Sequence, residues 1–229
     1  QYIKFSDIIS TNTKYYYRAY AKAGTSKKYG EVDSIYTKLD GKLVVIAGSG
    51  IIDLDGNTYE SIILGNGQEW MKSDLKTKKF NDGRSISYSI DMSSSATSSL
   101  TGAWKNGENG SVLYNRQAAY SACPLNWHLP SQLELGEFID YIGSEEFDNN
   151  TGGKVKDETN STWIGAVGSA TNESGFTAVP NVNTFSAMWW TSTNDGQNTW
   201  YYKVKAEDDK FIWATGSQHQ GVAIRCIKN

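Results

Sequence analysis

The sequence predicts an α+β protein, in which a partial β-sandwich precedes a larger domain of two helices, antiparallel strands and a long loop region. Three observations lead to this prediction. Apolar and polar residues alternate through many short segments, which is typical of strands buried on one face. One segment, residues 131–143, has helical spacing of apolar residues between a start and a stop signal. Residues 144–187 are rich in Asn, Thr and Gly, which favours loops.

Residues 1–38 are expected to form an incomplete β module. The segments YIKFSDII, KYYYRAYAKAG and EVDSIYTK alternate as strands do. TNTKYYYRAYA resembles the last strands of a fibronectin type III or immunoglobulin-like domain, in which a Tyr follows a turn. Three strands cannot close a sandwich, so we expect exposed edges or pairing with other segments. Residues 39–50 are predicted to be a linker whose apolar run, LVVIAG, packs as a strand.

The second unit begins near Ile51 with a predicted hairpin. Asp55 and Gly56 mark its tight turn, and TYESIIL forms the return strand. The D-x-D-G-N pattern also suggests a calcium loop. An EF-hand needs Gly at its sixth position and Glu at its twelfth. Counted from Asp53, Gly56 is fourth and Leu64 twelfth, so the turn interpretation is preferred.

Two helices are expected in the middle of the chain. LYNRQAAYSA at 113–122 favours a short helix because of its alanines. Ser131 and Glu134 form a capping box, in which each side chain bonds the other residue's backbone amide. Apolar residues follow at helical spacing through residues 135–142, and Gly143 ends the helix.

A long, mostly irregular region follows at 144–187. One short strand, TWIGAV at 162–167, is expected within it. Loops of this length in a compact domain are usually functional. Four strands are then predicted: AMWWTST, TWYYKVKAE, KFIWATG and GVAIRCIK.

Composition excludes two classes of partner. The chain has 22 Lys and Arg against 25 Asp and Glu, without a long basic block, so nucleic acid is not an expected partner. No stretch approaches the ~20 apolar residues that a membrane helix needs. The Thr-, Asn-, Gly- and Tyr-rich β composition suggests an exported surface protein. The 8 Trp and 14 Tyr require an aromatic core or exposed stacking surfaces.

Catalytic motifs are not found, so we expect no enzymatic activity. The sequence has two histidines far apart and no H-E-x-x-H, C-x-x-C, G-x-S-x-G or phosphate loop. The adjacent carboxylates at 145–146 and 208–209 flank predicted turns, whereas a glycosidase holds two carboxylates across a cleft. Cys123 and His128 could form a nucleophile and base only if the fold brought them together.

Five segments resemble the landmarks of the Fibrobacter succinogenes major paralogous domain family. They are DLDGNTYESIILGNGQEWMKSDLKTKKFNDG, LYNRQAAYSACPLNWHLPS, TNESGFTAVP, WWTST and GVAIRCIK, in that order over about residues 51–229. The resemblance implies an exported or cell-surface protein, in some cases a lipoprotein, of Fibrobacter- or Bacteroides-type bacteria. Immunoglobulin-like modules often precede the domain in that family. Element order also resembles the C-type lectin-like fold, with two helices, a long loop region and a curled antiparallel sheet.

The family resemblance also implies a disulfide. Its members have cysteines at the points occupied by Cys123 and Cys226, and an exported domain keeps such a bridge oxidised. Two free structural thiols and a reactive Cys123 are the alternatives.

The predicted function is non-enzymatic binding of a glycan or a surface protein, as an adhesin does. Sugars stack their flat C–H faces on aromatic rings and hydrogen-bond to amides and carboxylates. Of the adjacent Trp189 and Trp190, one should point outward from a regular strand. Tyr201 is expected on the outer face of its strand, whereas Trp213 shares a face with Phe211 and is expected in the core. Asn181, Asn194 and Asp195 could also ligate calcium, although one carboxylate is few for that ion. The candidate ligand-binding residues are Trp189, Trp190, Tyr201, Asn172, Asn181, Asn194 and Asp195. The alternative is a structural or assembly module of a surface appendage or lipoprotein, without a small ligand.

Overall fold

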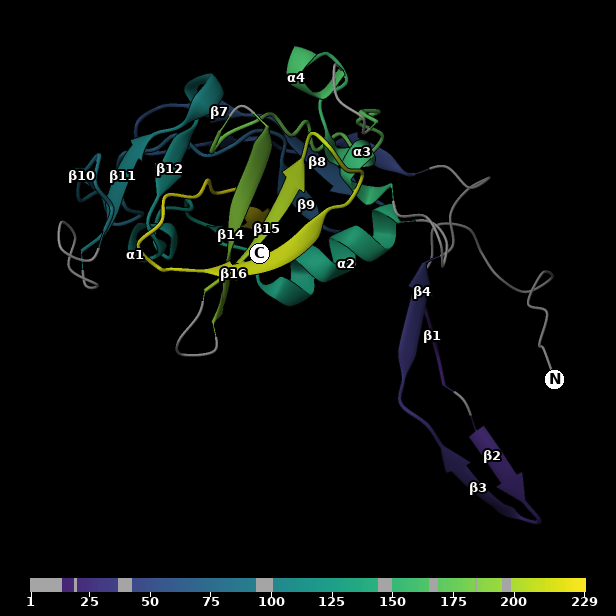
Figure 1. The fold of residues 1–229 in the computed structure, drawn as a ribbon. Helices are drawn as coiled ribbons and strands as arrows, with labels where there is room; N and C mark the ends of the chain where they lie inside the picture. Colours follow the sequence, from purple (N-terminus) through teal and green to yellow (C-terminus); the bar gives the residue numbers. More distant parts are fainter. Residues whose placement is uncertain are drawn as a thin grey trace.

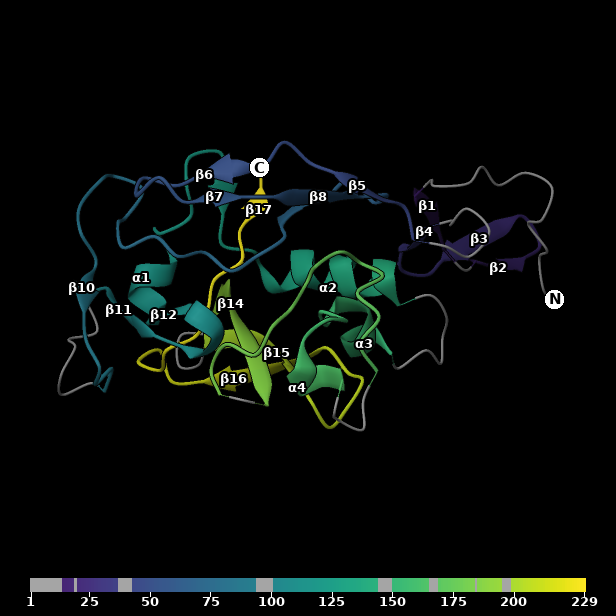
Figure 2. The ribbon, with the colours of Figure 1, turned by 90° about the horizontal axis from the view of Figure 1, so that it is seen from above.

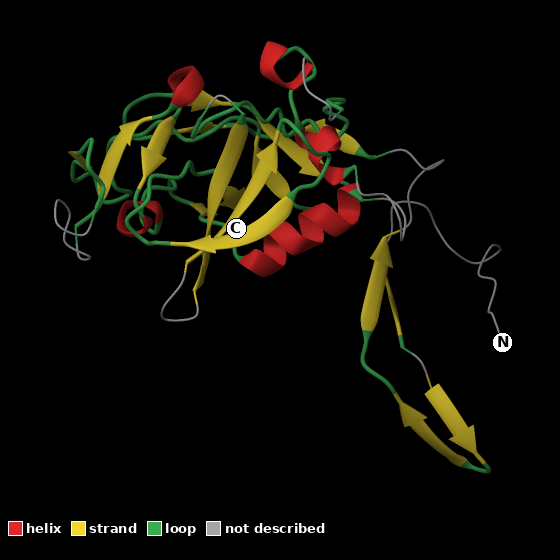
Figure 3. Ribbon diagram, viewed as in Figure 1, coloured by secondary structure: helices red, strands yellow, loops and turns green. Residues whose placement is uncertain are grey.

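The computed structural model describes residues 14–18, 20–36, 43–93, 101–143, 150–164, 169–183, 185–194 and 199–229. Within these ranges the protein is built mainly from short strands in six small sheets, joined by four short α-helices (Figures 1 and 3). The expected C-type lectin-like fold, with two helices and one curled sheet, is therefore wrong.

The last strands explain this difference. β14 (Ser186–Asn194), β15 (Thr199–Lys205) and β16 (Ile212–Gly216) form one antiparallel sheet. β17 (Ile227–Lys228) instead pairs with β9 (Glu69–Met71) in another sheet. The segment between β16 and β17 forms isolated β-bridges from Val222 to Tyr114 and from Ala223 to Trp189 of β14. Element order misled the prediction because it does not specify which strands pair.

A thin β-ribbon forms the N-terminal part of the described chain. β1 (Lys14–Tyr17) pairs with β4 (Asp33–Tyr36), and β2 (Tyr20–Ala23) pairs with β3 (Ser26–Tyr29). All residues of β2 and β3 are exposed, and the ribbon extends away from the body (Figures 1 and 2). The first predicted strand lies outside the described residues, and the likeness to a sandwich stays a prediction.

A five-stranded sheet has the order β13–β17–β9–β8–β5. β5 (Val45–Ala47) pairs with β8 (Ser61–Leu64), which confirms a strand within the apolar run of the predicted linker. β13 (Trp127–His128) forms the other edge. The predicted hairpin is also present, because β6 (Ile51–Ile52) pairs with β7 (Thr58–Tyr59) around a turn with Gly56 at φ 84°.

A small sheet and a short helix precede the cysteine-containing loop. β10 (Ser87–Tyr88), β11 (Ala103–Asn106) and β12 (Val112–Tyr114) form the sheet, with a 3-10 turn at Glu108–Gly110. α1 (Arg116–Ala119) lies within the predicted helical segment. The side chain of Asn115 caps it by accepting a hydrogen bond from the Ala118 amide at 3.0 Å.

The main helix, α2 (Gln132–Ile142), confirms its prediction in detail. Ser131 Oγ accepts from the Glu134 amide at 3.2 Å, and Glu134 Oε2 accepts from the Ser131 amide at 2.7 Å. The helix ends at Gly143, as expected. Its apolar face, which includes Leu135 and Phe138, is buried.

Two one-turn helices follow in the region expected to be irregular: α3 (Thr151–Val155) and α4 (Ser161–Ile164). The predicted strand at 162–167 is wrong over residues 162–164, and 165–167 lies outside the described residues. The Asn160 side chain accepts from the Thr162 amide at 3.0 Å, and its carbonyl accepts from the Trp163 amide. This local bonding favours a helical turn over a strand.

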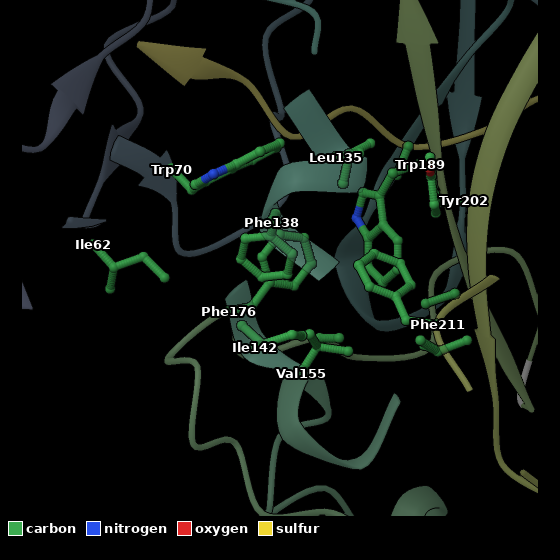
Figure 4. Close-up of a cluster of buried hydrophobic side chains, with 14 of the residues drawn as sticks. Ile62, Trp70, Leu135, Phe138, Ile142, Val155, Phe176, Trp189, Tyr202 and Phe211 are labelled. Carbon is green, nitrogen blue, oxygen red and sulfur yellow. The ribbon is translucent and has the colours of Figure 1, made fainter. Parts of the chain in front are cut away.

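Two hydrophobic clusters form the core, and β14 lies between them. Trp189 belongs to the first cluster, with Phe138, Phe176 and Phe211 (Figure 4). Trp190, the next residue, belongs to the second. Successive side chains of a strand point to opposite faces, so both faces of β14 are buried.

Candidate functional site

The two tryptophans predicted to form a binding surface are core residues. Trp189 is 1% exposed and Trp190 is 0% exposed. Trp189 Nε1 donates to Asp74 Oδ1 at 2.8 Å, and Trp190 Nε1 donates to the Tyr114 carbonyl at 2.8 Å. The expectation that one indole points outward is wrong, because the sheet carries a core on each face rather than solvent on one.

Two other predicted residues also have internal partners. Tyr201, expected outside, is 9% exposed and packs edge-to-face on Trp190 with ring centroids 5.9 Å apart. Asn181 is fully buried; its Nδ2 donates to Asp74 Oδ2 at 2.9 Å and its Oδ1 accepts from the Met188 amide at 2.8 Å. The structure thus brings Trp189 and Asn181 together on Asp74, within the core.

The other two described candidates, Asn172 and Asn194, do not belong to this core cluster. Asn172 has φ 49°, and its Oδ1 accepts from the Thr177 amide at 2.8 Å. Asn194 is exposed at the end of β14, where its Nδ2 donates to Tyr120 Oη at 2.6 Å. Asp195 lies outside the described residues. Within the described chain, no group of three His, Cys, Asp or Glu side chains is arranged to hold a metal ion.

A buried ion pair, which the sequence did not indicate, joins the core to the C-terminal segment. Arg225 Nη2 lies 2.7 Å from Asp74 Oδ1, with both side chains nearly inaccessible. The Arg225 guanidinium also donates to the Phe176 carbonyl and lies over the Phe176 ring, 3.9 Å from its centroid. Burial lowers the pKa of Arg225, while Asp74 opposes that shift. The pair is structural because solvent does not reach it.

The disulfide between Cys123 and Cys226 is present and spans 103 residues of sequence. Trp127 lies in the same hydrophobic cluster. His128 bonds Glu134 Oε1 through Nε2 at 2.8 Å and Asn229 Oδ1 through Nδ1 at 2.7 Å. Since the cysteine is oxidised and the histidine is bonded to Glu134 and Asn229, this loop joins α2 to the C-terminus.

A hollow of about 800 Å³ lies beside β5 and β8, and two of its lining residues, Ser49 and Ser61, form hydrogen bonds to Glu69. Glu69 Oε1 accepts from the Ser49 amide and hydroxyl and from Ser61 Oγ, and Oε2 accepts from Lys228 Nζ at 2.7 Å. Burial would raise the pKa of Glu69, but the hydrogen bonds from Lys228, Ser61 and Ser49 hold it at about 2. A carboxylate that stays ionised in this way holds the surrounding segments together through its hydrogen bonds and is not suited to donating a proton.

The strongest candidate site is a pocket of about 520 Å³ lined by residues of α2 and of the β14–β15–β16 sheet. Its aromatic wall is Trp213 on β16, which is 55% exposed. Trp213 lies against the half-buried Trp200 of β15, with ring centroids 4.6 Å apart. The sequence interpretation placed Trp213 in the core beside Phe211, and that is wrong. β16 is an edge strand, so Trp213 reaches solvent.

Polar side chains surround this indole. The polar residues that line the pocket with Trp213 include Gln132, Glu137, Asp140, Thr193 and Tyr202. Glu137 and Asp140 are three residues apart on α2 and therefore share a helix face. Tyr202 lies opposite Trp213 in the β-ladder, and its hydroxyl donates to the Gln132 carbonyl at 3.4 Å. The pocket thus combines a flat apolar surface with hydrogen-bonding groups, which the sequence could have indicated only through its aromatic content.

Comparison with known proteins gives one family. The family model described as the Fibrobacter succinogenes major domain matches residues 64–228. No curated protein and no solved structure matches the chain. In the described part of the chain, no helix is long and apolar enough to cross a membrane.

Proposed function

Because the chain belongs to the Fibrobacter succinogenes major domain family, we propose that it is a non-enzymatic, exported surface protein that binds a glycan at the Trp213 pocket. One observation carries the proposal. Trp213 on β16 is more than half exposed beside hydrogen-bonding groups, whereas the large aromatic residues of the neighbouring strands β14 and β15 are buried or half-buried. An exposed indole costs hydration free energy, and stacking against the flat face of a sugar would recover it.

The size and chemistry of the pocket support a sugar ligand. Its volume of about 520 Å³ lies within the range of small-molecule sites. A pyranose could stack on Trp213 while its hydroxyls bond to Gln132, Thr193 or the carboxylates of α2. Trp200 packs behind Trp213 and restricts the motion of its ring, which lowers the entropy lost on binding.

The positions of the carboxylates favour binding over hydrolysis. A glycosidase places its two carboxylates on opposite sides of the scissile bond. Glu137 and Asp140 instead lie on one face of one helix. They can therefore hold a sugar from one side only.

A glycan array followed by titration of the full chain tests the proposal. Trp213→Ala should weaken binding of any glycan hit by about tenfold, which corresponds to the ~1.4 kcal/mol of one aromatic stacking contact. Tyr88→Ala is the matched control, because Tyr88 is 51% exposed and packs on Trp104 at 4.8 Å but lies outside the pocket. Equal affinity of the wild type and Trp213→Ala would contradict the proposal.

A second candidate function is a structural or assembly module of a surface appendage or lipoprotein, which would contact a surface protein. The burial of both Trp189 and Trp190 favours it, since a module without a small ligand has no need of an outward indole on β14. In that case the wild-type chain should give no hit on the glycan array.

A further inference from the structure

The N-terminal β-ribbon and the body of the protein carry opposite net charges. Residues 14–30 contain five Lys and Arg and no Asp or Glu, whereas residues 39–229 contain 15 Lys and Arg against 22 Asp and Glu. All residues of β2 and β3 are exposed, and the ribbon extends away from the body (Figures 1 and 2). A positive segment that lies apart from a negative body favours an anionic partner at the ribbon.

Three of these cations share one face of the ribbon. Tyr20 pairs with Tyr29, and Lys22 pairs with Lys27, across the two strands. Directly opposite residues, and residues two apart in a strand, lie on the same face. The Arg18 guanidinium lies over the Tyr29 ring, 3.9 Å from its centroid, and Lys27 Nζ lies 5.4 Å from the centroid of the Tyr20 ring. We call the surface formed by Arg18, Lys22 and Lys27 the cationic face.

No carboxylate in the described chain neutralises the cationic face. Lys22 and Lys27 are directly opposite each other, which destabilises a sheet because like charges repel. Among the described residues, none of the three cations forms an ion pair with a carboxylate. An anion bound across the cationic face would reduce this repulsion and gain charge-assisted hydrogen bonds.

The two tyrosine rings position the cations for such a contact. Tyr20 and Tyr29 have ring centroids 6.1 Å apart and are 58% and 51% exposed. A cation held over a ring has fewer conformations to lose when an anion binds. The N–H donors of Arg18 lie in the plane of the guanidinium, a geometry that matches the paired oxygens of a carboxylate, phosphate or sulfate group.

We infer that the cationic face binds an anionic polysaccharide, a linear chain of sugars that bear carboxylate or sulfate groups. The choice of a polysaccharide rests on the proposed function as an exported, glycan-binding protein. The site itself is separate from the Trp213 pocket, which none of these ribbon residues lines.

Two other kinds of polyanion fit the ribbon less well. Duplex DNA has one charge per about 1.7 Å of its axis, and a protein bound to it can neutralise about 6–10 phosphates, so three cations are few. A lipid surface is bound through large apolar side chains such as Trp, Phe and Leu. Residues 20–29 contain none of these three residue types.

Binding of the full chain to dextran sulfate tests the inference, with unsulfated dextran of the same length as the neutral probe. The wild type should bind dextran sulfate more tightly than dextran, and the difference should shrink as salt screens the exposed charges. Lys27→Gln should weaken dextran sulfate binding about fivefold, which corresponds to the ~1 kcal/mol of two unit charges about 4 Å apart in water.

Lys28→Gln is the matched control. Lys28 is exposed and adjacent to Lys27, and its substitution removes the same charge. Because successive residues of a strand point to opposite faces, Lys28 lies on the other side of the ribbon, and its loss should change the affinity by less than about twofold. Equal losses in Lys27→Gln and Lys28→Gln would show attraction to the net charge of the ribbon alone and would overturn the inference.

The nature of the partner has its own tests. Failure of the wild type to bind dextran sulfate would overturn the inference. Tighter binding to phosphatidylglycerol vesicles or to polyuridylate than to dextran sulfate would assign the cationic face to a lipid surface or a nucleic acid, and would also overturn it.

Failure of this inference can be told apart from failure of the proposed function. Glycan hits that are lost in Trp213→Ala, from a chain that does not bind dextran sulfate, would overturn this inference and leave the pocket intact. Dextran sulfate binding that persists in Trp213→Ala but weakens in Lys27→Gln, with no neutral glycan bound, would support this inference and contradict the proposed pocket.

Discussion

Replacing Asp74 with Leu should destabilise the protein more than any exposed charge removal. Asp74 Oδ1 accepts from Arg225 Nη2 at 2.7 Å and from Trp189 Nε1 at 2.8 Å, and Oδ2 accepts from Asn181 Nδ2 at 2.9 Å. Leu removes these contacts, together with the hydrogen bond from Arg225 Nε at 3.1 Å, and leaves a guanidinium in the core.

The magnitude follows from burial. Removing one partner of a buried ion pair costs about 3–5 kcal/mol, because the remaining charge is desolvated and uncompensated. The Trp189 and Asn181 donors each lose a partner as well, at about 1–3 kcal/mol per orphaned group. These costs overlap, so we expect a loss of roughly 4–6 kcal/mol, which is a large part of the 5–15 kcal/mol typical of domains.

Urea unfolding followed by circular dichroism measures this loss. The exposed pair of Lys72 and Glu60, with its atoms 3.0 Å apart, is the matched control. Glu60→Gln should cost less than about 1 kcal/mol, because solvent screens an exposed pair.

A double variant tests the mechanism. Asp74→Leu with Arg225→Met replaces the pair by apolar groups, so it should be more stable than Asp74→Leu alone. Two results would refute the conclusion that the buried ion pair stabilises the core. One is that Asp74→Leu costs no more than Glu60→Gln, and the other is that the effects of Asp74→Leu and Arg225→Met simply add.

Four other predictions follow from the described contacts. Replacing both Cys123 and Cys226 with Ser should destabilise the chain by about 4–5 kcal/mol, because the bridge closes a loop of about 100 residues; an unchanged urea midpoint would contradict this. The folded-state pKa of Glu69, about 2, lies below its ordinary value, so its stabilisation should be fully present above pH ~4.5 and lost as pH falls toward 2; Glu69→Gln should show a weaker fall in melting temperature over that window. Ser131→Ala should cost about 1 kcal/mol through loss of the helix cap, measured against Ser131→Thr. Limited trypsin treatment should cleave the ribbon at residues 20–29 before the body, since that isolated hairpin is exposed throughout; first cleavage within the body would be the contrary result.

Short-range patterns in the sequence predicted the elements that local bonding controls. The capping box fixed the start of α2, and the Asp55–Gly56 turn fixed the β6–β7 hairpin. Both depend on atoms only a few residues apart, so the sequence contains the whole cause. The strand predicted over TWIGAV was wrong at residues 162–164 for the same kind of reason, because the bonds made by Asn160 favour a helical turn there.

The candidate site could not be predicted because burial is decided between distant segments. Alternation along β14 correctly places Trp189 and Trp190 on opposite faces, but it cannot say that a second core covers the outer face. The exposure of Trp213 likewise follows from the edge position of β16, which depends on strand pairing.

The sequence by itself determined the family, the cysteine pair that the family implies, the capped helix and the hairpin turn. Only the tertiary structure decided which aromatic side chains reach solvent and which strands share a sheet. It also joined Asp74 to Arg225, 151 residues apart. The physical reason is that helix caps and turns arise from local hydrogen bonds, whereas burial and strand pairing arise from contacts that the chain makes only after it has folded.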